Sequence, residues 1–293
     1  MYKNIHEAYD RFKESGVQDP VEETMHLLDL LSAGTMRRLN HSVLESKDAC
    51  LEIIKKRSQG NMPMEYILGK AVFMGNEFLC TQDTLIPTED TDLLVQVAAG
   101  NANKLNMANK PCTIIEIGTG CGNIAISLAL QLENVRIFAS DISPNAVAVA
   151  QQNVDKYQVK EKVSLFCGDM FSPFQELGYQ GAIDMVICNP PYIPTTSLAK
   201  LSAEIVDYEP RVALDGGAYG IDAFKKLIAN ARDFLSPAGM LLFEIGERQE
   251  KFVERLFGKN GGYQGVVHFK KHGKIRVMGA QKNEQERIYA GKD

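Results

Sequence analysis

Short apolar runs alternate with helical segments from residue 113 onward, and this alternation constrains the fold of the chain more than any other feature. Each run has the length of a buried strand, and each intervening segment can form a covering helix. Strands connected in this way lie parallel, so we predict a doubly wound α/β fold with a mostly parallel sheet covered on both faces. The five runs are Thr113 to Ile117, Arg136 to Ser140, Val163 to Cys167, Ile183 to Cys188 and Met240 to Ile245.

Two further apolar runs follow, Val266 to Phe269 and Ile275 to Met278, and only residues 270–274 separate them. A connection of this length permits an antiparallel hairpin but no parallel crossover. We therefore predict an antiparallel strand at or near one edge of the sheet. Two covering helices are expected to begin at Ser143-Pro144 and to run from Gly220 to Phe234.

The first 70 residues show a helical period instead. The first helix has apolar residues at Ile5, Ala8, Tyr9 and Phe12. The second is predicted to begin with Asp19 as cap, Pro20 at the first helical position and Glu22 at the capping-box site. Its expected buried face consists of Met25, Leu28 and Leu31, and a third helix is expected from Glu45 to Ser58.

A β-hairpin is predicted next, with Ala71-Val72-Phe73 and Glu77-Phe78-Leu79 joined by a turn at Gly75-Asn76. After Pro87, a helix over Thr91 to Ala99 leads into the alternating region. We therefore predict a helical domain over residues 1–70, a β-hairpin linker over residues 71–87 and a main α/β domain over residues 88–293.

The composition excludes several classes of protein. The 293 residues carry a net charge of -5, which disfavours nucleic acid as the primary partner. Six dispersed cysteines and five dispersed histidines show no metal-ligand spacing, so we predict no metal site and interpret the cysteines as reduced core thiols. No signal peptide or membrane-spanning run is present, and we expect a cytoplasmic monomer with no membrane partner.

A glycine-rich loop follows the first strand of the alternating region. It reads Gly118-Thr119-Gly120-Cys121-Gly122, and Asp141 ends the next strand. Glycines permit a sharp turn and close approach of a ligand, and a carboxylate at this distance can bind ribose hydroxyls. The G-x-G-x-G spacing lacks the extra residue typical of a pyrophosphate site, which favours S-adenosylmethionine over NAD. A plain strand-to-helix turn and a nicotinamide dehydrogenase are the alternatives.

Asp169 and Met170 lie just beyond the strand Val163 to Cys167. A carboxylate at this edge of the sheet could accept from an adenine amino group, and a thioether could pack on the ring. A helix cap and a core methionine are an equally good interpretation.

The apolar run Ile183 to Cys188 leads directly into Asn189-Pro190-Pro191-Tyr192. Two prolines fix the backbone and remove two donors, which leaves carbonyl groups as acceptors. The Asn189 side chain adds an acceptor, and Tyr192 offers a flat apolar face. The tetrapeptide therefore predicts a catalytic site for a planar NH2 group, whereas the alternative interpretation is a rigid turn.

With these motifs, the chain resembles the glutamine side-chain amide methyltransferases that modify peptide chain release factors. The resemblance covers nearly the whole sequence. It includes Glu65-Tyr66-Ile67-Leu68-Gly69, Leu85-Ile86-Pro87, the glycine loop with Asp141, the tetrapeptide continuing into Ile193-Pro194, and the stretch from Tyr208-Glu209-Pro210-Arg211 to Asp215-Gly216-Gly217.

The resemblance implies a Rossmann-like methyltransferase sheet and transfer of one methyl group from S-adenosylmethionine to the glutamine of a Gly-Gly-Gln loop. It also implies that the N-terminal helices dock a protein substrate. Alternatives are a paralogue that methylates a glutamine of a ribosomal protein and an adenine-N6 nucleic-acid methyltransferase.

The sequence departs from the family pattern at two places. Thr88-Glu89 replaces the usual Arg-Pro pair, and Phe269-Lys270-Lys271 stands where an aspartate is common. The cations of the last hairpin are Lys270, Lys271, Lys274 and Arg276. A solvated hairpin tip is the prediction for this cluster, and ribosomal RNA or an acidic partner is the alternative.

Overall fold

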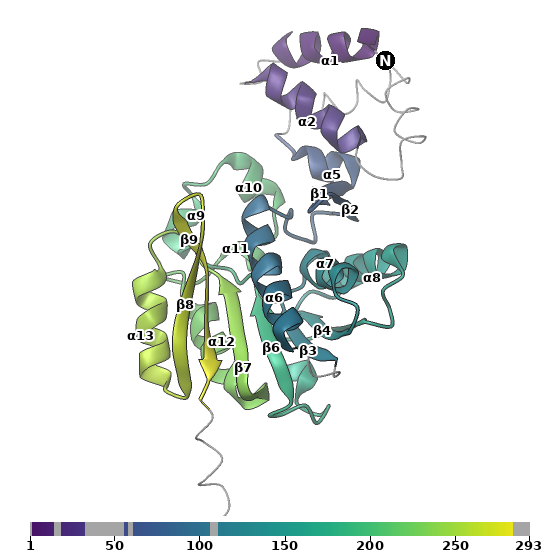
Figure 1. The fold of residues 1–293 in the computed structure, drawn as a ribbon. Coiled ribbons are helices and arrows are strands. Elements are labelled where there is room, and N and C mark those ends of the chain that lie inside the picture. Colours follow the sequence, from purple (N-terminus) through teal and green to yellow (C-terminus); the bar gives the residue numbers. More distant parts are fainter. Residues whose placement is uncertain (1, 15–18, 33–55, 58–60, 106–110, 284–293) are drawn as a thin grey trace, which may run out of the picture. The chain divides into compact units, whose positions relative to one another are not determined.

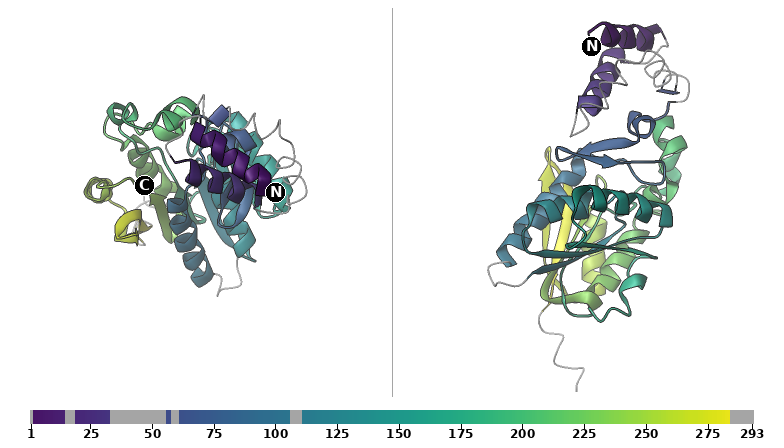
Figure 2. Two further views of the ribbon diagram at one scale, coloured as in Figure 1. Left: turned by 90° about the horizontal axis from the view of Figure 1, so that it is seen from above. Right: turned by 90° about the vertical axis from the view of Figure 1, so that its right-hand side faces the viewer.

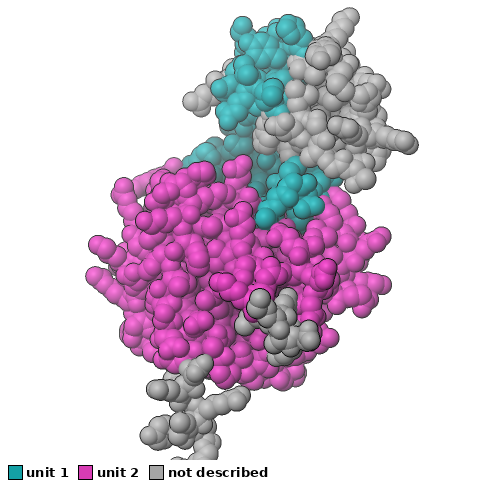
Figure 3. Space-filling view, in the orientation of Figure 1, with its two compact units in different colours: residues 1–87, 201–210 teal, residues 88–200, 211–293 magenta. Residues whose placement is uncertain are grey.

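The computed structural model describes residues 2–14, 19–32, 56–57, 61–105 and 111–283. Two compact units comprise residues 1–87 with 201–210, and residues 88–200 with 211–293, as coloured in Figure 3. Each unit is considered by itself. Of the predicted third helix, Glu45 to Ser58, all residues except Lys56 and Arg57 lie outside the described part of the chain.

The smaller unit begins with two helices, α1 (Tyr2–Glu14) and α2 (Pro20–Ser32). In α1, Ala8 and Phe12 are buried as predicted. The predicted cap of α2 is confirmed, because the Asp19 carboxylate accepts from the backbone N–H of Val21 at 3.1 Å and of Glu22 at 2.9 Å.

The predicted buried face of α2 is wrong at Met25, which is 53% exposed. The buried positions are Thr24 and Leu27. Thr24 can be buried because its hydroxyl donates to the Pro20 carbonyl at 2.6 Å, which satisfies its polar group within the helix. The side chains of Leu28 and Leu31 lie outside the described set.

The predicted hairpin is present in the smaller unit, but its turn is displaced by one residue. Helix α5 (Met64–Leu68) precedes β1 (Lys70–Phe73) and β2 (Asn76–Leu79). Phe73 pairs with Asn76, so the turn is Met74-Gly75 and not Gly75-Asn76. Both turn residues have positive φ, 49° and 76°, which matches the right-handed twist of the two strands. Helix α10 (Ala203–Tyr208) also belongs to this unit.

The larger unit contains a seven-stranded sheet in the order β5-β4-β3-β6-β7-β9-β8 (Figure 1). The four pairings from β5 to β7 are parallel. The pairings of β7 with β9 and of β9 with β8 are antiparallel. The strands are β3 (Cys112–Ile117), β4 (Val135–Asp141), β5 (Val163–Cys167), β6 (Ile183–Cys188), β7 (Leu235–Glu244), β8 (Tyr263–Lys271) and β9 (Lys274–Lys282). The predicted mostly parallel sheet with an antiparallel hairpin at its end is confirmed.

Helices cover both faces of this sheet (Figures 1 and 2). Those on one face are α6 (Asp92–Leu105), α7 (Asn123–Gln131) and α8 (Pro144–Tyr157), and those on the other include α12 (Asp222–Phe234) and α13 (Glu250–Asn260). Buried side chains of β3, β6 and β7 pack against α12 and α13 in one core. The predicted start of α8 is confirmed, since the Ser143 hydroxyl accepts from the Ala146 N–H at 3.2 Å.

Short helices complete the larger unit: the 3-10 segments η1 (Glu89–Thr91) and η3 (Ser172–Phe174), and α9 (Thr195–Leu198) and α11 (Arg211–Leu214). Thr91 thus ends a 3-10 turn, and the α-helix predicted to begin there begins one residue later. The hairpin between β8 and β9 turns at His272-Gly273 only, because Lys271 already pairs with Lys274.

Candidate active site

The glycine loop leaves the carboxyl end of β3 and enters α7. Gly118, Gly120 and Gly122 all have positive φ, at 72°, 56° and 84°. The N–H groups of Gly118 and Thr119 donate to the Ser140 carbonyl at 2.8 and 2.9 Å, which ties the loop to the end of β4. A β-carbon at Gly118 or Gly120 would meet no atom within 4 Å. The loop therefore borders open space on the side where a ligand can approach the backbone.

Beneath the loop lies Glu116, whose side chain is completely buried at the end of β3. Its Oε2 accepts from the Thr119 hydroxyl at 3.0 Å, while its Oε1 has no partner among the described residues. Burial raises the pKa of Glu116 to about 8. An orphaned carboxylate oxygen beside a glycine cradle fits a ligand that brings a cation or an N–H donor, as S-adenosylmethionine does through its ammonium group.

Asp141 lies at the end of β4 and stabilises the same loop. Its Oδ2 accepts from the Gly120 N–H at 2.9 Å, and its Oδ1 accepts from the Ser143 N–H at 2.9 Å. Each carboxylate oxygen has a further lone pair, so both remain able to accept from a hydroxyl. The carboxylate predicted to bind ribose is thus held rigidly next to the glycine loop.

The third predicted ligand segment follows β5. Asp169 is exposed and has the Lys226 ammonium at 3.8 Å. Met170 adopts a positive φ of 49°, its carbonyl accepts from the Ser140 hydroxyl at 3.3 Å, and its side chain packs against the core. The Ser140 side chain therefore joins the Met170 backbone to the strand end that also holds the glycine loop.

The Asn-Pro-Pro-Tyr tetrapeptide follows β6 and is held by backbone contacts. The Tyr192 carbonyl accepts from Gln249 Nε2 at 2.9 Å, and Gln249 Nε2 also donates to the Gly220 carbonyl at 3.1 Å. A β-carbon at Gly216 would lie 2.8 Å from the Pro191 carbonyl oxygen, and one at Gly220 would lie 2.2 Å from the Tyr192 carbonyl oxygen. The turn is thus packed against a glycine-containing loop that leaves no room for side chains at Gly216 and Gly220.

That loop belongs to the stretch that follows Pro210. Ile193 forms a parallel bridge with Asp215, with the Ile193 N–H donating to the Leu214 carbonyl at 3.1 Å. The Asp215 carboxylate accepts from the Thr195 hydroxyl at 2.6 Å and from the Gly217 N–H at 3.0 Å. Through these two bonds, the Asp215 carboxylate caps the turn that begins at Gly217.

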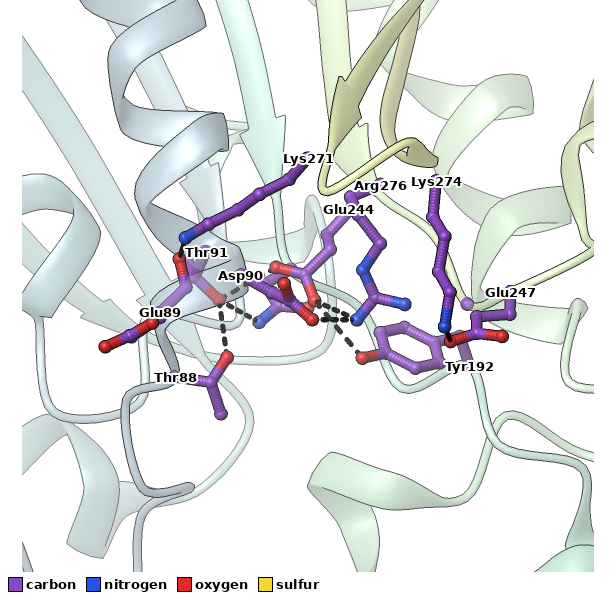
Figure 4. A network of polar contacts seen from close by, with 12 residues as sticks. Thr88, Glu89, Asp90, Thr91, Tyr192, Glu244, Glu247, Lys271, Lys274 and Arg276 are labelled. Carbon is purple, nitrogen blue, oxygen red and sulfur yellow. Dashed lines mark hydrogen bonds and ion pairs between the residues drawn. The ribbon is translucent and has the colours of Figure 1, made fainter.

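A buried polar network adjoins the tetrapeptide, and sequence reasoning missed it (Figure 4). Its centre is Glu244 at the end of β7, only 1% exposed. Tyr192 donates its hydroxyl to Glu244 Oε1 at 3.1 Å, Thr91 donates to Glu244 Oε2 at 2.8 Å, and Arg276 Nη2 lies 4.0 Å from Oε1. Burial raises the pKa of Glu244. The available signal was an acidic residue within the apolar run Met240 to Ile245.

The cations of the last hairpin are largely engaged by acidic residues of the same unit. Arg276 contacts Asp90 at 2.5 Å, and Lys274 contacts Glu247 at 2.5 Å. Lys271 donates to the Glu89 carbonyl and has the Asp92 carboxylate at 4.0 Å. The predicted solvated tip is therefore wrong for Lys271 and Arg276, whose side chains are only 19% and 12% exposed beside residues 89–92. Lys274 remains exposed to solvent, at 61%, in its ion pair with Glu247.

A family model described as a methyltransferase domain matches residues 108–290. The release factor glutamine methyltransferase of Moorella thermoacetica is 36% identical, over 98% of this chain and 94% of that protein. The release factor glutamine methyltransferase of Geobacter sulfurreducens is also 36% identical, over 81% of this chain and 79% of that protein. This chain belongs to the release factor glutamine methyltransferase family. It is an S-adenosylmethionine-dependent methyltransferase, as the sequence predicts.

Solved methyltransferases share the fold at low sequence identity. A methyltransferase from Pyrococcus furiosus gives a TM-score of 0.51 at 17% identity, covering 81% of this chain and 100% of that one. The hMettl16 catalytic domain, solved in complex with MAT2A 3'UTR hairpin 1, gives 0.56 at 14% identity and covers 81% of this chain and 80% of that one. The predicted Rossmann-like methyltransferase sheet is confirmed.

The described cysteines of the methyltransferase do not all fit the prediction of core thiols. Cys80, Cys112, Cys121 and Cys188 are buried, but Cys167 is exposed. Burial raises the pKa of Cys121, in the glycine loop, to about 12, so this thiol stays protonated. Among the described residues, no helix combines the length and apolar character needed to cross a membrane.

Proposed function

We propose that this methyltransferase modifies the side-chain amide nitrogen of the glutamine in the Gly-Gly-Gln loop of a peptide chain release factor. The observation that carries the proposal is the intact Asn-Pro-Pro-Tyr turn after β6, packed into place by Gly216 and Gly220. The two relatives named above are both release factor glutamine methyltransferases, which supports the same substrate.

The proposed cofactor site comprises residues from the ends of four neighbouring strands, β3, β4, β5 and β6: Gly118, Thr119, Gly120, Cys121, Gly122, Asp141, Asp169, Met170 and Asn189. Backbone groups of the glycine loop would contact the amino-acid part, with Glu116 Oε1 as a buried acceptor. Asp141 would accept from ribose, and Asp169 from the adenine amino group, with Met170 against the ring. When bound, S-adenosylmethionine supplies an electrophilic methyl group on sulfur.

The proposed catalytic residues are Asn189, Pro190, Pro191 and Tyr192. An amide nitrogen is a poor nucleophile because its lone pair is delocalised into the carbonyl. The Asn189 side-chain oxygen and the Pro190 carbonyl would accept the two N–H protons of the glutamine amide. Such bonds orient the nitrogen and stabilise the positive charge that develops on it. The proton then leaves to water, so no basic side chain is required.

Tyr192 would form one wall of this amide site. Its ring is held by the bond of its hydroxyl to buried Glu244, so that the ring cannot rotate away freely. A fixed aromatic face limits the glutamine to a planar approach. We further propose that the N-terminal helical domain docks the release factor. On α2 of this domain, the apolar side chains of Val21 and Met25 are 58% and 53% exposed to solvent.

The test offers labelled S-adenosylmethionine and the enzyme to a purified release factor, ribosomal proteins, and adenine-containing DNA and RNA. We expect label on the release factor, lost when its loop glutamine is changed to alanine. Label on ribosomal protein alone would move the enzyme to a paralogous function, and label on nucleic acid alone would make it an adenine methyltransferase. Separately, S-adenosylhomocysteine and not NAD should raise the melting temperature.

A further inference from the structure

The Thr91 hydroxyl occupies a position between the buried carboxylate and the proposed catalytic asparagine. Its oxygen lies 2.8 Å from Glu244 Oε2 and 3.1 Å from Asn189 Nδ2. A third neighbour, the Thr88 hydroxyl oxygen, lies 3.3 Å away. Thr91 is itself buried, at 2% exposure, so these contacts replace solvent. Figure 4 shows Thr88, Thr91, Glu244 and Tyr192 converging from three separate segments of the larger unit.

The number of protons decides the direction of every bond in this group. A hydroxyl has one proton and two lone pairs, whereas an ionised carboxylate can only accept. Glu244 accepts from both Thr91 and Tyr192, so the single Thr91 proton is directed to Glu244. Toward Asn189, the Thr91 oxygen can therefore act only as an acceptor. The side-chain NH2 of Asn189 must face Thr91, and its carbonyl oxygen must face the opposite way.

We propose that Thr91 and Glu244 are positioning residues that select one of the two amide orientations of Asn189. The selected orientation presents Oδ1, the acceptor, to the N–H group of the substrate amide. The reverse orientation would present a donor to another donor, and the substrate nitrogen would lose the bond that aligns it. The consequence for catalysis rests on the proposed function, whereas the orientation itself does not.

The Thr88 hydroxyl fits the same scheme. Because the Thr91 proton is committed to Glu244, Thr88 donates to the second lone pair of the Thr91 oxygen. The Thr91 hydroxyl then makes three bonds, one donated and two accepted, and cannot reverse its direction without breaking one of them. Burial raises the pKa of Glu244, whereas the bonds from Thr91 and Tyr192 and the charge of Arg276, 4.0 Å from Oε1, lower this pKa and favour the ionised carboxylate on which the arrangement depends.

The orientation can be measured without any substrate, by hydrogen exchange of the Asn189 side-chain NH2 in the full-length protein. The resonance is assigned by its loss in Asn189→Asp. We expect exchange at least about tenfold slower than that of exposed Asn103 in wild type and in Thr91→Ser, which keeps the hydroxyl. Thr91→Val, of similar shape, should abolish the protection. Rapid exchange in wild type, or unchanged protection in Thr91→Val, would overturn the proposal.

The catalytic consequence is tested with a double-mutant cycle on methyl transfer to the release factor. Thr91→Val should lower kcat about tenfold, the equivalent of one hydrogen bond, with little change in KM or in binding of S-adenosylhomocysteine. Thr91→Ser should restore most of the rate. In an Asn189→Ala background, Thr91→Val should have no further effect, because there is no amide to orient.

A full additional loss in the double variant would show that Thr91 acts through general stability and would refute its positioning role. If wild-type enzyme does not methylate the release factor, the proposed function fails, and the exchange measurement still decides the orientation of Asn189. The two failures are therefore distinguishable.

Discussion

Replacing Gly220 with alanine should destabilise the fold and displace the catalytic turn. Gly220 has a φ of 67°, a conformation that costs an L-residue about 1 kcal/mol. The added β-carbon would also lie 2.2 Å from the Tyr192 carbonyl oxygen and 2.9 Å from Gln249 Nε2. Since both neighbours belong to one hydrogen-bonded unit, the turn must shift, at a further cost of about 2 kcal/mol.

Gly178→Ala provides a matched control. Gly178 has a φ of 71°, but a β-carbon there would meet no atom within 4 Å. Both variants therefore carry the backbone strain, and only Gly220→Ala carries the collision. At roughly 3 °C per kcal/mol for a unit of this size, Tm should fall by about 3 °C in the control and by about 9 °C in Gly220→Ala.

Calorimetry and methyl-transfer kinetics together test this reasoning. Displacement of Tyr192 by a fraction of an ångström should lower kcat at least about tenfold in Gly220→Ala, while the control retains normal kcat. Equal Tm values and equal kcat values in the two variants would show that the turn accommodates a side chain, and the account of its rigid packing would be refuted.

Three further outcomes are expected. Gly120→Ala should fold with the same modest loss of Tm as Gly178→Ala. Calorimetry should nevertheless show that it binds S-adenosylhomocysteine at least about 100-fold more weakly, because the added β-carbon would enter the proposed ligand space. Unchanged affinity would show that the glycine loop is not part of the cofactor site. Burial raises the pKa of Glu116 from 4.5 to about 8. The contribution of this protonated carboxyl to the free energy of unfolding is therefore fully present below about pH 4.5 and is lost as the pH rises through about 8. Chemical denaturation should accordingly show a decline of up to about 1.4 kcal/mol per pH unit that is absent in Glu116→Gln; identical pH profiles would contradict this. The double change Val21→Glu with Met25→Glu should raise KM for the release factor about tenfold and leave S-adenosylhomocysteine binding unchanged, whereas an unchanged KM would exclude this face of α2 from docking.

The strands of the larger unit could be predicted because their signal is local. An apolar run of five or six residues, such as Ile183 to Cys188, has few ways to be buried except as a central strand. Caps are equally local, and both Asp19 and Ser143 accept from N–H groups within three residues of themselves. Turn positions were less accurate, since Asn76 can serve either in a turn or as the first residue of a strand.

The buried network could not be predicted, because its members are far apart in the chain. Thr91 and Glu244 are separated by 153 positions, and Thr91 and Asn189 by 98. No periodicity or motif links such residues. The sequence likewise predicted a solvated tip for the whole last hairpin, whereas the Arg276 side chain is 12% exposed and pairs with Asp90, a residue 186 positions away.

By itself, the sequence determined the order of strands along the chain, the glycine loop and the Asn-Pro-Pro-Tyr turn, because each depends on neighbours within a few residues. Only the tertiary structure decided which acceptor faces which donor around Asn189. The direction of those bonds follows from a proton count over side chains of η1, β7 and the segment after β6, and these meet only when the sheet has formed.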